Sequence, residues 1–268
     1  MEKDEREIYP NAPLRFVAFE LRTPQVPAFA GREATAAVYD GLRDLVPIIA
    51  PQPMIELQAP LNAVALATPG GQLRMLNRKR TLSVTLSPNA LIVENTAYDR
   101  FENFLEVIER VVAAAASAAP IAGMHRIGLR YIDEIRVPGL SSPHEWKAYI
   151  DPSLLAAAAL ETPFEPTTTQ GVTEFRVAEG FNAAMRFGAL VGRTVDPNGP
   201  LRVKGDEDGP FFLIDLDSFW TAPADDTPEF SASAVTEICM QLRAPIRTLF
   251  EASITDELRN QVLRKEVA

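Results

Sequence analysis

The segment RIGLRYIDEIRV, residues 126–137, alternates apolar and polar side chains along most of its length. Ile127 and Leu129 fall on one side of an extended chain, and Arg126 and Arg130 fall on the other. Successive side chains of a β-strand point to opposite faces. This period of two therefore predicts a strand with one face in the core and one polar face.

Strands and long helices follow one another in a pattern that occurs twice. Two segments with helical spacing of apolar residues, 99–117 and 232–251, each come after a run of strand-like segments. The other expected strands are 14–22, 54–58, 61–67, 73–77, 81–87, 90–95, 172–178, 183–191 and 211–219, and further helical segments are expected at 31–46, 143–160 and 256–265.

Runs of strands without regular strand–helix alternation predict the α+β class. We expect two lobes, residues 1–140 and 141–268, each an antiparallel sheet packed with one long helix. With no flexible linker near the middle, the two lobes are expected to form one compact unit. The repeated order also suggests an internal duplication, although no residue-level repeat is visible.

Composition excludes several classes of protein. One cysteine and two histidines in 268 residues cannot form an internal disulfide or a Cys/His zinc site. The formal net charge of −10 argues against general binding of nucleic acids or anionic membranes. The charged start and the lack of about 20 consecutive apolar residues predict a cytoplasmic protein with no membrane span. We expect no cofactor and no bound metal.

The charge is unevenly distributed along the chain. Residues 1–134 contain 14 basic and 16 acidic residues, whereas residues 135–268 contain 12 and 20. We call residues 206–229 the acidic stretch, because they include eight acids and no Lys or Arg. The densest basic cluster spans 74–80. A partner surface is one interpretation, and a solvated loop region is the other. The candidate partner-binding residues are Asp206, Glu207, Asp208, Asp225, Asp226, Arg78, Lys79 and Arg80.

Few residues suggest catalysis. Asp215 and Asp217 lie two apart on a predicted strand, so both carboxylates share a face and are weak candidates to hold a divalent cation for nucleotidyl transfer. The Gly-Ser turn that such enzymes need is missing upstream, and a solvent-facing sheet edge is the alternative. Cys239 lies beside the apolar stripe of its helix, which favours a core position over a nucleophile.

Arg126 and Arg130 are candidates for ligand binding. Both fall on one face of the strand at 126–137, together with Glu134. A guanidinium can bind a carboxylate ligand through two parallel hydrogen bonds. The alternative is an ion pair between neighbouring strands that serves structure alone.

Several segments together resemble a sporadically distributed bacterial and archaeal family of conserved hypothetical proteins. They are YPNAPL at 9–14 leading into FELR, LSPNALIVEN at 86–95, RIGLRYI at 126–132, and Phe250-Glu251 followed by ITDEL at 254–258. RIGLRYI is the most specific of them. Phe101 stands where that family has a tryptophan. The resemblance covers nearly the whole chain and implies no established activity. The family's patchy distribution is compatible with mobile or defence-associated genes.

Three hypotheses for function follow. The first is a non-catalytic protein that binds another macromolecule through the acidic stretch, as a component of a toxin–antitoxin or phage-defence operon. The second is a metal-dependent enzyme that acts on a nucleotide or other phosphorylated substrate through Asp215 and Asp217. The third is a small-ligand receptor that uses a cleft between the lobes, with Arg130 as the anchor. A homo-oligomer is also expected, because meander sheets leave strand edges to be covered.

Overall fold

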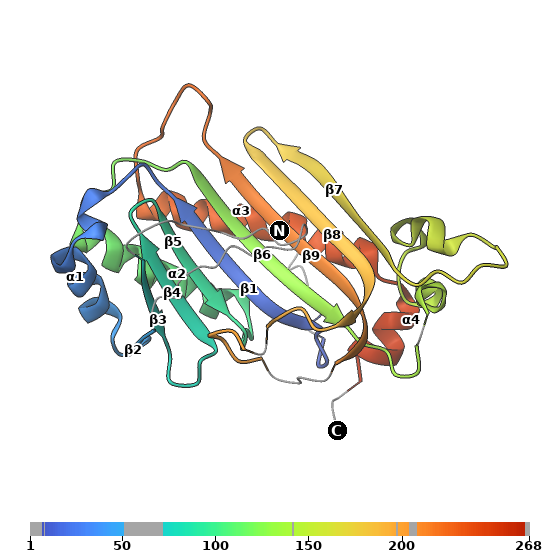
Figure 1. Ribbon diagram of the computed structural model, residues 1–268. Helices are drawn as coiled ribbons and strands as arrows, with labels where there is room; N and C mark the ends of the chain where they lie inside the picture. The colour runs from blue at the N-terminus through green and yellow to red at the C-terminus, as the bar shows by residue number, and fades with distance from the viewer. Residues whose placement is uncertain are drawn as a thin grey trace.

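The computed structural model describes residues 7, 9–50, 72–140, 142–196, 198–203 and 208–265. Its strands form one antiparallel sheet of nine, in the order β2-β3-β4-β5-β1-β6-β9-β8-β7 (Figure 1). Their bounds are β1 Leu14–Arg22, β2 Ile48–Ile49, β3 Leu73–Leu76, β4 Leu82–Ser87, β5 Ala90–Asn95, β6 Arg126–Ile135, β7 Thr169–Ala178, β8 Phe181–Gly192 and β9 Gly209–Thr221.

The helices form a second layer on one face of this sheet (Figure 1). They are α1 Arg32–Leu42, α2 Phe101–Ala118, α3 Ala232–Ser253 and the single turn α4 Asp256–Leu258, which continues into a π-helical turn at Arg259–Leu263. The short helical region expected at 143–160 consists of three 3₁₀ turns, at Pro143–Ala148, Pro152–Leu154 and Ala156–Ala159. None of the helices in the described part of the chain combines the length and apolarity needed to cross a bilayer.

The α+β class with antiparallel pairing is confirmed, whereas the expectation of two separate sheets is wrong. Strand β6 pairs with β9 along ten residues, from Arg126 opposite Thr221 to Ile135 opposite Phe212. This pairing joins six strands of residues 1–140 to three strands of residues 141–268. An amphipathic strand with an unpaired edge gains a full ladder of hydrogen bonds by joining a neighbouring sheet, so two sheets with matching faces fuse.

Each half still contributes one meander followed by a long helix. Strands β3, β4 and β5 lead into α2, and strands β7, β8 and β9 lead into α3. The two meanders lie on opposite sides of the central β1–β6 pair. The internal duplication stays a prediction, and the strands expected at 54–58 and 61–67 lie outside the described residues.

Alternation along the central strands separates the two faces. In β1, Val17, Phe19 and Leu21 are fully buried on the helix-covered face. Phe16 and Glu20 alternate with them and line the opposite face. Because no helix of the described chain covers that second face, we call it the open face of the sheet (Figure 1).

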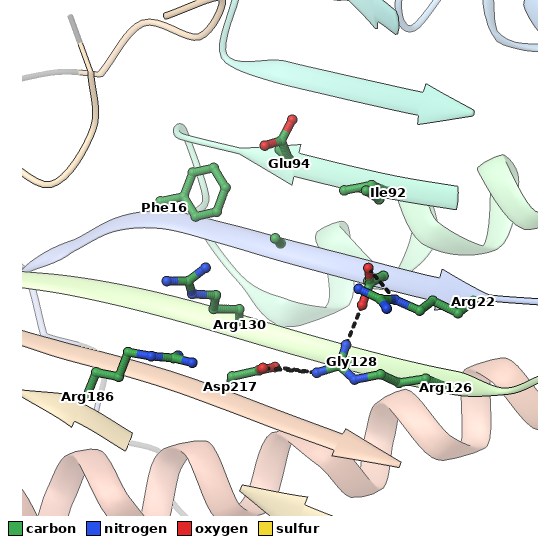
Figure 2. Close-up of a pocket in the computed structure, with 11 residues that line it drawn as sticks. Phe16, Arg22, Ile92, Glu94, Arg126, Gly128, Arg130, Arg186 and Asp217 are labelled. Atoms are coloured by element: carbon green, nitrogen blue, oxygen red, sulfur yellow. Dashed lines mark hydrogen bonds and ion pairs between the residues drawn. The ribbon is translucent and has the colours of Figure 1, made fainter. Parts of the chain in front are cut away.

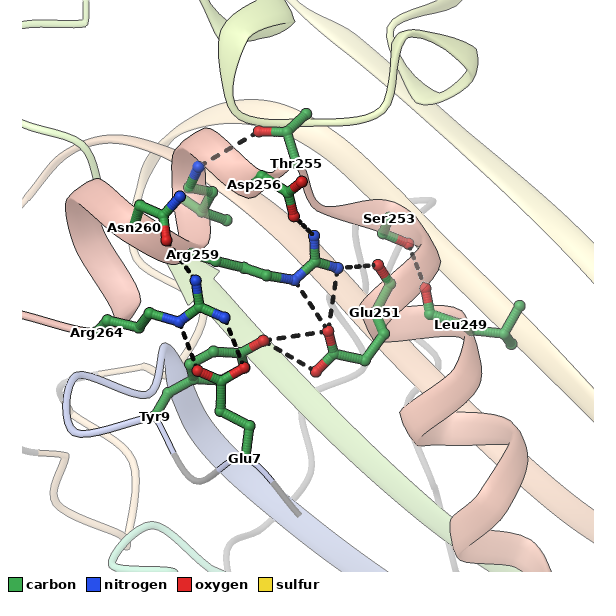
Figure 3. A network of polar contacts seen from close by, with 11 residues as sticks. Glu7, Tyr9, Leu249, Glu251, Ser253, Thr255, Asp256, Arg259, Asn260 and Arg264 are labelled. Carbon is green, nitrogen blue, oxygen red and sulfur yellow. Dashed lines mark hydrogen bonds and ion pairs between the residues drawn. The ribbon is translucent and has the colours of Figure 1, made fainter. Parts of the chain in front are cut away.

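A polar network ties the two ends of the described chain together (Figure 3). The Tyr9 hydroxyl donates to both carboxylate oxygens of Glu251, at 3.2 and 3.1 Å. Arg259 donates to the same carboxylate and to Asp256. Burial and the charge of Glu251 raise the pKa of Tyr9. Thr255 begins the last helical turn by accepting from the Leu258 backbone amide. The family-like segments near residue 9 and at 250–258 are therefore in contact, and the contact is structural.

We expect Glu251→Ala to loosen the N-terminal segment. The change removes the acceptor shared by Tyr9 and Arg259, and a partly exposed charged hydrogen-bond pair contributes on the order of 1–2 kcal/mol. Hydrogen exchange measures the result, and the Asn11 amide should exchange faster because it bonds to the Leu263 carbonyl nearby. Glu257→Ala is the control, since the Glu257 carboxylate accepts a hydrogen bond from Gln261 within the same helical segment. Equal protection of Asn11 in both variants would contradict the role given to Glu251.

Candidate functional site

The open face carries a cavity of about 420 Å³ over the centre of the sheet. Five neighbouring strands, β5, β1, β6, β9 and β8, supply its walls. Its charged lining residues are Arg22, Arg126, Arg130, Arg186, Glu20, Glu94 and Asp217 (Figure 2). We call this cavity the arginine groove. It lies where the sequence has its strongest strand, and the polar side of that strand forms its floor.

Arg126 joins two strands at one end of the arginine groove. Its guanidinium donates to Asp217 on β9 at 2.9 Å and also bonds to Glu20 on β1. The ring of Phe219 stacks against it, with the guanidinium carbon 4.6 Å from the ring centroid. Burial raises the pKa of Asp217, although the positive charges of Arg126 and Arg130 oppose that rise. Arg126 is therefore held by structural contacts on three sides.

Arg130 pairs with Asp215, the most deeply buried carboxylate that the groove arginines contact. Its Nε and Nη2 atoms each donate to one oxygen of Asp215, both at 2.7 Å. The Asp215 side chain is only 4% exposed, and Arg186 on β8 approaches the same carboxylate at 3.6 Å. Burial works against the charge of Arg130, but the hydrogen bonds and charge of Asp215 outweigh it and raise the pKa. The structure thus places the arginine expected as a ligand anchor in a structural pair.

Not all donors of the groove arginines are used by these pairs. A guanidinium has five N–H donors, and a carboxylate satisfies two of them in a bidentate pair. Arg22 gives its Nε to Glu20 and keeps a side chain that is 48% exposed. Arg186 makes only the longer contact to Asp215 among the described residues. The aliphatic and aromatic side chains of Ile92 and Phe16 line the same cavity. The groove therefore offers N–H donors beside an apolar wall.

Asp215 and Asp217 do share a face, as their spacing predicts, but arginines hold both carboxylates. Their negative charge is matched by Arg126, Arg130 and Arg186 from the two adjacent strands. A metal ion at this place would have to displace those guanidinium groups. Among the described residues, no cluster of three or more His, Cys, Asp or Glu side chains is placed to hold a metal ion.

The acidic stretch is divided by strand β9. Asp208 lies before the strand and pairs with Arg193 at 2.8 Å, while Asp225 and Asp226 lie in the exposed loop after it. Since β9 spans Gly209–Thr221, these loops are roughly 40 Å apart along the strand. Asp206 and Glu207 lie outside the described residues. The described acids of the stretch are thus spread over both ends and the middle of the sheet instead of forming one patch.

The basic cluster forms an exposed hairpin tip. Arg78, Lys79 and Arg80 are exposed, and Arg80 takes a left-handed backbone conformation with φ 55°. The Asn77 side chain fixes the turn by accepting from the Thr81 and Leu82 amides. The Arg80 carbonyl accepts from Arg202 in the β8–β9 connection. This hairpin therefore already touches the connection that leads into the acidic stretch of its own chain.

The β8–β9 connection covers one end of the open face. Thr194 is held by the buried carboxylate of Glu134, which accepts from both the backbone amide and the hydroxyl. Further along, Leu201 packs with Leu76 and Phe16 in a small apolar cluster of its own. Glu134, which the sequence places on the same face as Arg126 and Arg130, thus anchors this connection.

Cys239 is buried within α3, and burial raises the pKa of its thiol to about 12. The thiol stays protonated at neutral pH, so it lacks the thiolate character of a catalytic cysteine. The core position expected from its place beside the apolar stripe agrees with this environment.

Four charged residues of the groove escaped the sequence reasoning: Glu20, Arg22, Glu94 and Arg186. Each lies on a strand segment that was predicted, and each falls on the polar side of that strand. In β1, the alternation of apolar and polar side chains could have identified Glu20 and Arg22 as residues of the polar face. Arg186 could be found only through the pairing of β8 with β9, which places it opposite Asp215.

Compared with known protein families and with curated proteins, the chain matches none of them. The resemblance to a sporadically distributed bacterial and archaeal family therefore stays a prediction that depends on the segments quoted above. The geometry of the open face is the basis for the proposals that follow.

Proposed function

We propose that this protein is a non-catalytic binding protein that receives an acidic group of a protein partner in the arginine groove. The observation that carries the proposal is the set of N–H donors on Arg22, Arg130 and Arg186 that the groove's own carboxylates leave unused. Every described carboxylate of the groove has an arginine partner, so an incoming anion meets donors whose nearest negative charges are already compensated.

The shape and lining of the groove support a side chain as the ligand group. A cavity of about 420 Å³ is large enough for one or two side chains and small for a folded element. Phe16 and Ile92 provide apolar contact beside the donors. A glutamate or aspartate next to an apolar residue fits this combination of surfaces. The sequence predicted binding through the acidic stretch, which would require a basic partner. The proposal instead places binding in the arginine groove, so the partner group is acidic.

Hexaglutamate peptide is a suitable probe for calorimetric titration. We expect wild-type protein to bind it in the range of about 10–100 µM and Arg186→Gln to bind it roughly ten-fold more weakly, because one charge-assisted hydrogen bond is lost. Arg186 suits this test because Asp215 retains its two hydrogen bonds from Arg130 after the change. Affinity should also fall as salt is added, since the interaction is ionic.

Arg78→Gln is the matched control. It removes the same charge from an exposed hairpin tip outside the groove. Equal weakening by Arg78→Gln and Arg186→Gln would mean that net charge alone binds the peptide, and would overturn the proposal. Failure of the wild-type protein to bind hexaglutamate would overturn it as well.

The toxin–antitoxin or defence context and the cytoplasmic location remain predictions from the sequence. They are compatible with a binding role, and the groove does not depend on either. The hairpin tip at Arg78–Arg80 is a candidate partner surface from the sequence alone, and the proposal gives it no part in binding the acidic group.

A further inference from the structure

Exposed apolar side chains lie on β7, the strand at one edge of the sheet, and on the segment that precedes it. The described chain exposes seven large apolar side chains, and four of them belong to residues 160–177. A fifth, Met240, lies one helical turn before Ala244, which lines a groove beside β7. The five residues are Leu160, Phe164, Val172, Val177 and Met240. Scattered apolar residues are normal on a surface, whereas a concentration at one edge indicates a contact site.

A second groove, lined mostly by apolar side chains, lies between β7 and helix α3. Helix α3 packs mainly against β9, β6 and β8, so the helix-side face of β7 is only partly covered, with Phe175 half-buried against the core. The groove has a volume of about 580 Å³, with Phe175 and Val177 on the strand side and Pro245 on the helix side. This part of the fold therefore exposes both unpaired backbone and apolar side chains along one strand.

The charges on β7 are complementary to those of a second β7 in antiparallel orientation. Glu174 and Arg176 are both exposed on the open face, two residues apart, and neither forms an ion pair with another residue of the described chain. If two copies pair with Phe175 opposite Phe175 of the second copy, Glu174 lies opposite Arg176 of the second copy. The reverse pair forms at the same time, because a two-fold interface repeats every contact.

We propose that two copies of this chain associate through β7 in this register and form one continuous sheet. The edge N–H and C=O groups of β7 gain partners, and two cross-strand ion pairs fix the register. On the helix side, Thr173 of each copy covers Val177 of the other, and the two Phe175 rings lie together. The irregularity between Arg176 and Ala178 in the pairing with β8 lies beyond the central ion pairs. The proposal is independent of the arginine groove.

Sedimentation velocity of three purified chains tests the register. At concentrations on the order of 100 µM we expect wild-type protein to sediment with twice the chain mass of 29.4 kDa. Glu174→Arg and Arg176→Glu each place like charges opposite one another at two positions, so each alone should dimerise at least ten-fold more weakly. An equimolar mixture of the two variants restores both ion pairs, and the mixture should sediment as a dimer.

Circular dichroism should show the same fold for both variants, because the two side chains are exposed. Glu33→Arg is the matched control, because Glu33 is an exposed residue of α1 away from β7, and this change should leave the dimer unchanged. If the wild-type protein is a monomer at this concentration, the proposal is wrong. It is also wrong if the edge of β7 pairs with an extended peptide of another protein and not with a second copy. Dimers that persist in either variant, or a mixture that stays monomeric, overturn the register.

Discussion

Arg130→Met is expected to lower the free energy of unfolding by about 3 kcal/mol, measured by urea denaturation at neutral pH. The variant keeps a side chain of similar length but removes the bidentate partner of Asp215, whose carboxylate is 4% exposed. A buried carboxylate without its partner has lost its hydration and gains little in return. Arg186, at 3.6 Å from the same carboxylate, compensates only part of the loss.

A double variant distinguishes the effect of losing the ion pair from the effect of losing the packing contacts of the Arg130 side chain. Arg130→Met combined with Asp215→Asn removes both charges, so most of the lost stability should return. Arg22→Met is the matched single-arginine control, and it should cost less than about 1 kcal/mol because Arg22 is half exposed and Glu20 keeps Arg126. If Arg130→Met and Arg22→Met cost the same, the Arg130–Asp215 pair is not a structural contact.

Asp133→Asn is expected to raise the free energy of unfolding, by roughly 4 kcal/mol at pH 7. Asp133 lies on the helix-covered face of β6, between Leu14 and Ile214 of the neighbouring strands. No hydrogen bond joins its side chain to another described residue. Burial, with a smaller contribution from the negative charge of Asp215, raises the pKa of Asp133 from 3.8 to about 8.

The pH dependence of stability explains why Asp133→Asn should raise the free energy of unfolding. Between pH 4 and pH 8 the folded protein holds a proton on Asp133 that the unfolded chain has released. The wild-type protein therefore loses stability through Asp133 as the pH rises across this window. Asparagine does not titrate, so the advantage of the variant should be small near pH 4 and should grow up to about pH 8.

Urea denaturation at several pH values between 4 and 8 measures the difference between the two proteins. Asp40→Asn is the control, because Asp40 is exposed on α1 and its substitution should leave the profile of the wild-type protein unchanged. A constant difference between Asp133→Asn and wild type across the whole window would show that Asp133 does not titrate as its burial implies.

Local structure was predictable from the sequence because its signals are local. The segment 14–22 forms a strand with the predicted bounds, and the helix expected at 99–117 forms at Phe101–Ala118. In both, the repeat of apolar side chains matches the geometry of one element, whichever partner it later meets. The place of Cys239 in the core followed from the same repeat.

The candidate site was predictable only in part. The sequence indicated that Arg126 and Arg130 share one face, and likewise Asp215 and Asp217. It did not indicate that the two sets are partners, because Arg130 and Asp215 are 85 residues apart. The acidic stretch therefore looked uncompensated along the chain, although arginines on β6 and β8 neutralise its central acids.

By itself, the sequence determined the α+β class, the positions of most described strands and long helices, and which side of each central strand is polar. These properties depend on residue spacing within one element. The fusion of two expected sheets into one, the pairing of the Asp215 and Asp217 carboxylates, and the division of the acidic stretch by β9 depended on which strand edges meet. Such pairing joins residues far apart in the chain, and its free energy comes from contacts that exist only after the sheet has formed.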